Sequence, residues 1–122
     1  MTDTDIRFRR SYRLLSSSEF QPVLDSPDIR VGGAHLLVLV RNATNGSARL
    51  GLIVAKRRVR HAVWRNRIKR VCRESFRLRR ADLTGLDIVI LVRSPLPQPD
   101  AAAVRAELER LWDKLLAKRG QA

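Results

Sequence analysis

Cysteine is almost absent from this chain of 122 residues, which contains only Cys72. A single cysteine can form no internal disulfide, which fits a reducing compartment, and we expect a cytoplasmic protein. The two histidines lie far apart in the sequence, and no cluster of acids or second cysteine accompanies them. This pattern is not that of a metal centre, so we predict that the polypeptide alone binds no metal ion.

Long apolar segments are also missing. The longest apolar runs, His35–Val40 and Ile88–Val92, are far too short to span a bilayer. The first five residues are polar and acidic, unlike a signal or transit peptide. We therefore expect no membrane partner.

The chain lacks the patterns that mark catalytic polypeptides. It has no paired carboxylates, no nucleophile beside a general base and no glycine-rich loop of the kind that holds phosphates. Cys72 falls on an apolar helical stripe, which favours a buried and inert thiol over a nucleophile. The sequence therefore predicts no catalytic residue.

Positive charge is what the chain has in abundance, with 25 Lys and Arg against 12 Asp and Glu. Twelve of the 25 lie between Lys56 and Arg80, where the only acid is Glu74, so this window carries 12 − 1 = +11. The remaining residues carry 13 − 11 = +2 of the total of +13. Charge of one sign concentrated on one element predicts a polyanionic partner.

The length of 122 residues, the absence of a dividing linker and the concentrated positive charge predict a single RNA-binding domain over residues 1–122, with residues 1–6 disordered. A capping box with Ser16 as N-cap and Glu19 three residues later predicts a helix that runs to about Asp25, interrupted by Pro22. Strands are predicted at 35–41, 49–56 and 86–93, with 29–31 as a candidate for a fourth, and two further helices at 62–79 and from Asp100 to Gly120. This order predicts an α/β fold, a two-layer sandwich of three helices and a sheet of about four strands.

The helix predicted at 62–79 is strongly amphipathic. At about 100° per residue, the side chains predicted to be buried fall within about 80° of Ile68; they are Trp64, Val71, Cys72, Ser75 and Phe76. The opposite side carries Asn66, Arg70, Arg73 and Arg77, flanked by Arg67 and Lys69, while Arg65 lies near the apolar border and should project sideways.

A row of guanidinium groups along a helix matches the spacing of phosphates on a folded RNA. A merely solvated face would mix charges of both signs, and this face offers only Glu74. Asn66 can hydrogen-bond a ribose hydroxyl or a base edge. DNA binding is not indicated, because no helix-turn-helix or zinc pattern is present.

The same residues carry a family resemblance. The segments Gly51–Arg57 (GLIVAKR) and Ala62–Arg70 (AVWRNRIKR) resemble the signature of the bacterial ribonuclease P protein component, whose hallmark is Arg-Asn-Arg followed by Lys-Arg after one spacer. Further matching positions are Phe8, Arg13-Leu14, Glu19-Phe20, Arg73-Glu74, Phe76 and Asp87–Arg93. The resemblance covers nearly the whole chain except the first few residues and the loops 26–34 and 42–48.

The resemblance implies the protein subunit of an endoribonuclease whose catalytic RNA removes the 5′ leader of precursor tRNA. In such a complex the protein is not the catalyst, and Mg²⁺ is held mainly by the RNA subunit. It also implies a left-handed βαβ crossover through the basic helix, although general rules favour a right-handed one. The partners would be the catalytic RNA and precursor tRNA. The alternative from composition and fold is a general RNA-binding or ribosomal protein.

Carried over by position, the RNA-facing residues are Lys56, Arg57, Arg65, Asn66, Arg67, Lys69, Arg70 and Arg73. Lys56 and Arg57 are expected at the end of the strand that enters the helix. Phe8 and Phe20 are candidates for a cleft that stacks on the unpaired leader, although Phe20 could equally belong to the core. The chain departs from many relatives in having Leu24 where a second Phe is common, and in having Pro22 inside the first helix.

Overall fold

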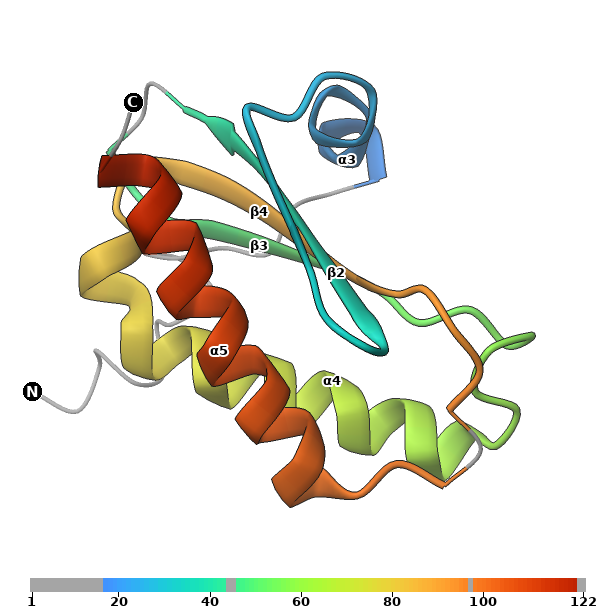
Figure 1. The fold of residues 1–122 in the computed structure, drawn as a ribbon. Coiled ribbons are helices and arrows are strands. Elements are labelled where there is room, and N and C mark those ends of the chain that lie inside the picture. Colours follow the sequence, from blue (N-terminus) through green and yellow to red (C-terminus); the bar gives the residue numbers. More distant parts are fainter. Residues whose placement is uncertain (1–16, 44–45, 97, 121–122) are drawn as a thin grey trace, which may run out of the picture.

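The computed structural model describes residues 17–43, 46–96 and 98–120 (Figure 1). Helix α3 is followed by two strands, a third strand leads into the long helix α4, and a fourth strand precedes the last helix, α5. The bounds are α3 Ser17–Asp25, β1 Ile29–Gly32, β2 Leu36–Asn42, β3 Arg49–Ile53, α4 Ala62–Arg79, the 3₁₀ turn η1 Arg80–Leu83, β4 Leu86–Val92 and α5 Ala101–Gly120. No helix in this described part of the chain is both long and apolar enough to cross a membrane.

The four strands form one mixed sheet in the order β1-β2-β4-β3. Strand β2 is antiparallel to both β1 and β4, whereas β3 runs parallel to β4. Parallel neighbours cannot be joined by a tight turn, and here α4 provides the crossover between them. The predicted α/β class, the four-stranded sheet and the crossover through the basic helix are confirmed.

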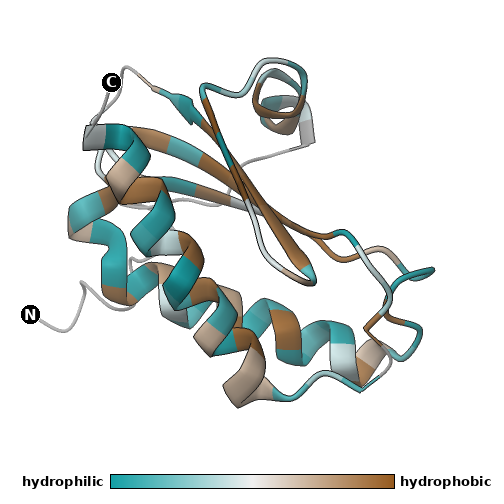
Figure 2. Ribbon diagram, in the orientation of Figure 1, coloured by the Kyte–Doolittle hydropathy of each residue, from teal (hydrophilic) through white to brown (hydrophobic). Residues whose placement is uncertain are grey.

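Both faces of the sheet are covered, which explains why β2 and β4 are almost continuously apolar. Successive side chains of a strand point to opposite faces. Leu36 and Val38 pack into the large core beneath α4 and α5, and Leu37 and Leu39 pack into a second cluster on the side of α3. Figure 1 shows α3 across the sheet from the two long helices, and Figure 2 shows the apolar colour along β2 and β4. Helix α3 thus adds a short partial layer to the predicted sandwich.

Most predicted element boundaries agree closely with the structure. Helix α4 spans the predicted residues, and α5 begins after Asp100, whose Oδ1 accepts the backbone N–H of Ala102 at 3.1 Å. Strand β3 ends at Ile53, three residues before the predicted end, because the carbonyl of Ala55 accepts N–H groups of the turn that follows. The Ser16 cap and residues 1–6 lie outside the described residues.

Two buried polar groups of α5 orient this helix on the rest of the fold. Glu107 accepts the backbone N–H groups of His35 and Leu36 at 2.9 and 2.8 Å, and so ties α5 to the turn between β1 and β2. Trp112 donates its indole N–H to Ser75 Oγ of α4 at 2.7 Å. This bond explains why a serine interrupts the apolar stripe of α4, since a buried indole N–H needs an acceptor.

Candidate RNA interface

The inner face of α4 is built into the core. Its buried residues are Ile68, Val71, Cys72, Ser75 and Phe76, and Trp64 is partly buried against the same cluster. The predicted apolar stripe is therefore confirmed. Burial raises the pKa of the Cys72 thiol to about 12, because desolvation of the thiolate outweighs the attraction of Arg73. The thiol is therefore protonated at neutral pH, as expected for an inert cysteine.

The outer face of α4 presents the cations of the predicted motif to solvent. Asn66, Arg67 and Arg70 are exposed, and Lys69 and Arg73 are half-buried at its margins. Val63, which is 63% exposed, lies on the same face about 20° from Arg70 around the helix axis. The structure thus brings five of the predicted RNA-facing residues together on one side of one helix.

Arg65 points sideways, as predicted, and has a structural partner. Its Nη1 donates to the backbone carbonyls of Val59 and Arg60, at 2.9 Å each. The side chain therefore fastens the start of α4 to the loop before it. Because one guanidinium carries five N–H donors, several remain available for a phosphate.

Lys56 and Arg57 are exposed, but they do not end a strand. They lie in the turn that follows β3, so the expectation that they terminate that strand is wrong. The turn closes on the carbonyl of Ala55 and leads into the start of α4. Both side chains therefore extend the basic surface beyond the first residues of the helix.

At the end of α4, cations are paired with acids. Arg77 donates to Glu74 at 2.6 Å, and this bond, together with the charges of Arg77 and Arg105, lowers the pKa of the Glu74 carboxyl. Arg79 turns toward α5 and contacts Glu109 at 2.8 Å and Asp113 at 3.0 Å. The uncompensated charge of the helix is therefore concentrated toward its beginning and middle.

A groove lies between α4 and the beginning of α5. Its volume is about 380 Å³, and its lining residues are Arg67, Arg70, Val71, Glu74, Ala101 and Arg105. We refer to it as the α4–α5 groove. Arg105 was not among the predicted site residues, because it lies on a different helix in a stretch of mixed charge. Only the packing of α5 against α4 places it beside the motif.

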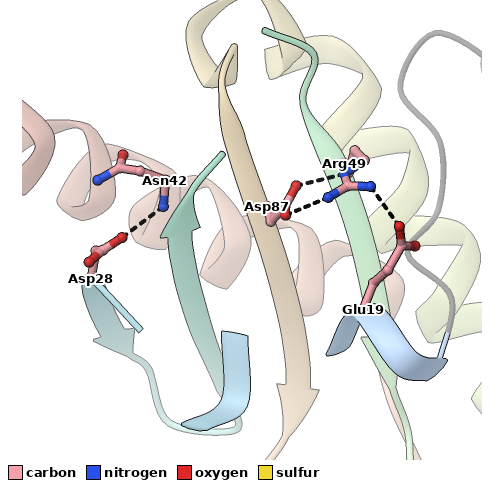
Figure 3. Close-up of polar contacts among 5 residues, drawn as sticks. All are labelled: Glu19, Asp28, Asn42, Arg49 and Asp87. Carbon is pink, nitrogen blue, oxygen red and sulfur yellow. Dashed lines mark hydrogen bonds and ion pairs between the residues drawn. The ribbon is translucent and has the colours of Figure 1, made fainter. Parts of the chain in front are cut away.

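On the other face of the sheet, α3 is fastened by an ion-pair cluster (Figure 3). Arg49 of β3 donates to both carboxylate oxygens of Asp87 on β4, at 2.8 and 2.7 Å, and to Glu19 of α3 at 2.7 Å. Figure 3 shows the guanidinium of Arg49 between the two acids. The cluster holds α3 at a fixed position over the sheet.

Phe20 of α3 lies against the sheet at Gly51. A Cβ at Gly51 would approach the Phe20 ring to 2.5 Å, so glycine is what allows this close contact. The ring is half-buried beside Val23, Leu37 and Val89, which gives it a packing role and also leaves part of it accessible. Phe8, the other residue predicted for the cleft, lies outside the described residues.

His61 is exposed just before α4. Its ring meets that of Trp64 edge-on, with centroids 4.4 Å apart. Within the described ranges, no three His, Cys, Asp or Glu side chains are grouped as a metal ion would require.

Comparison with known proteins identifies the family. The model of the Ribonuclease P family matches residues 8–116. The ribonuclease P protein component of Alcanivorax borkumensis is 47% identical over 116 residues, covering 94% of this chain and 95% of that protein. That of Azotobacter vinelandii is 41% identical, covering 93% and 88%.

The solved structures that resemble this chain are also ribonuclease P proteins. The ribonuclease P protein of Staphylococcus aureus matches with a TM-score of 0.75 and 25% identity, covering 84% of this chain and 94% of that one. The protein from Thermotoga maritima matches with a TM-score of 0.65 and 28% identity, covering 86% and 91%. These findings support the predicted ribonuclease P function over the general RNA-binding or ribosomal alternative. The chain therefore belongs to the ribonuclease P protein family.

Proposed function

We propose that this protein serves ribonuclease P by binding two RNAs through two separate surfaces. The outer face of α4 binds the catalytic RNA, and the surface around α3 binds the 5′ leader of precursor tRNA. The observation that carries the proposal is the orientation of α4, whose apolar side is in the core and whose cations face solvent. Membership of the family supplies the reaction in which these surfaces take part.

The separate roles of the RNA subunit and of the protein follow from the chemical groups that each one contributes. Hydrolysis of a phosphodiester needs an activated water and stabilisation of the negative charge that develops on phosphate oxygens, which Mg²⁺ bound to RNA would supply. The protein contributes guanidinium and ammonium groups, which attract phosphates and reduce repulsion between two RNAs. In this scheme the protein raises the affinity for substrate, and cleavage belongs to the RNA subunit. We place the complex in the cytoplasm, where tRNA precursors are made.

Reconstitution tests this proposal. Precursor tRNA, a bacterial ribonuclease P RNA and this protein are combined at low Mg²⁺ concentration, and each macromolecule is omitted in turn. We expect release of the intact leader only when both RNA and protein are present, because low Mg²⁺ leaves repulsion between the two RNAs unscreened. Cleavage by the protein alone, or no stimulation of the RNA by a folded protein, would contradict the proposed role.

The face of α4 is tested by Arg70→Ala, with Arg110→Ala on α5 as a control of equal charge. Loss of one charge-assisted phosphate contact should weaken binding to the catalytic RNA about tenfold. The slope of log affinity against log salt concentration should fall by about 0.7–0.9. The Arg110 variant should match the wild type. Equal affinities and equal salt slopes for the two variants would show that the outer face of α4 does not bind RNA.

Phe20→Leu separates the two roles of Phe20, because leucine retains apolar packing but has no aromatic face. If the ring stacks on an unpaired leader base, the variant holoenzyme should lose about 1–3 kcal/mol of its preference for precursor over mature tRNA. The thermal stability of the protein should change much less than in Phe20→Ala. An unchanged preference in both variants would assign Phe20 to the core alone.

A further inference from the structure

The α4–α5 groove brings together charges that no single segment of the sequence contains. Arg67 and Arg70 line one wall, one helical turn apart on α4, and Arg105 reaches the groove from α5. Figure 1 shows the beginning of α5 crossing beside the middle of α4. The groove therefore extends the outer face of α4 onto a second helix.

The cations of the groove are available for a ligand. In the part of the chain that the structure describes, no hydrogen bond or ion pair joins Arg70 or Arg105 to an acid, and Arg67 contacts only the carbonyl of Pro99 at 3.5 Å. The one acid of the groove, Glu74, is held by Arg77 at 2.6 Å. The three guanidinium groups thus face one carboxylate, which is hydrogen-bonded to Arg77 outside the groove and is also attracted by the charge of Arg105.

The shape and the lining fit one unit of an RNA backbone. Val71 and Ala101 give the groove an apolar part, against which a ribose can pack, and the guanidinium groups can hold the phosphate by paired N–H donors. A volume of about 380 Å³ is within the range of sites that take small organic ligands. A planar guanidinium on each of two helices also restricts the direction in which a strand can cross.

We propose that the α4–α5 groove binds a phosphate and its ribose from the backbone of the RNA partner, with Arg105 as a ligand opposite Arg67 and Arg70. The inference rests on the proposed binding of RNA by α4 and deepens it. It adds α5 to the RNA-binding surface and gives the crossing of the two helices a function. By holding the strand from two sides, the groove fixes how the RNA lies on the protein.

Arg105→Ala tests the groove, with Arg110→Ala as its matched control. The two residues lie on the same helix and differ by about 140° around its axis. The full-length variants are titrated with a bacterial ribonuclease P RNA over a range of salt concentrations. We expect Arg105→Ala to bind about tenfold more weakly, with a slope of log affinity against log salt smaller by about 0.7–0.9, and Arg110→Ala to match the wild type. Equal affinities and slopes for the two variants would overturn the proposal.

Two further variants make the test specific. Arg105→Lys keeps the charge but loses the planar fork, so it should restore the salt slope and only part of the affinity. The double variant Arg70→Ala/Arg105→Ala should lose less affinity than the product of the two single losses, because both groups hold one phosphate. Strictly multiplicative losses would contradict a shared phosphate.

RNA-binding and leader-removal measurements distinguish an error in the groove proposal from an error in the proposed function. If Arg105→Ala binds RNA normally but the wild-type protein supports leader removal, only the groove is wrong. If RNA binding depends on Arg105 but leader removal does not respond to the protein, the groove stands and the processing role falls.

Discussion

Burial of the apolar side of α4 against the sheet is the constraint on which the RNA-binding surface depends. Ile68, Val71 and Phe76 lie in the core, and burying a side chain of this size contributes about 1.5–3 kcal/mol. Repulsion between two exposed cations is weaker, about 1 kcal/mol at 4 Å in water, and salt screens it at separations beyond a Debye length of about 8–10 Å. Burial of the apolar side therefore fixes the rotation of α4 about its own axis, and this rotation places the cations on the solvent side.

The cations of α4 make different contacts at different positions along the helix. Arg65 fastens the helix to the preceding loop, and Arg79 joins it to α5 through two acids. Arg67 and Arg70 remain exposed between these two structural contacts. On the other face of the sheet, Arg49 also has a structural role, because its ion pairs with Glu19 and Asp87 hold α3 in place. One residue type thus serves both to assemble the fold and to present charge.

Features that depend on local pattern could be predicted, and those that depend on tertiary packing could not. The bounds and the buried stripe of α4 follow from a period of 3.6 residues that is plain in the sequence. The burial of Glu107 depends on where the turn between β1 and β2 meets α5, and no nearby residue signals it. Arg105 likewise lies beside the motif only because α5 packs against α4, which no local pattern in the sequence indicates. The family was recognisable because the Arg-Asn-Arg hallmark lies on this helix and further matching positions extend along nearly the whole chain.

The orientation of the protein in the complex is tested most directly by identifying which RNA lies against the outer face of α4. Cys72 is buried and protonated, so a cysteine introduced at Val63 provides a single reactive thiol without changing any charge. An iron–EDTA group attached there should cut the catalytic RNA at a few neighbouring sites, whereas the same group at Ala117→Cys, near the end of α5, should not cut those sites. Equal cutting patterns from both positions, or cutting from Ala117→Cys alone, would contradict the orientation proposed for the complex.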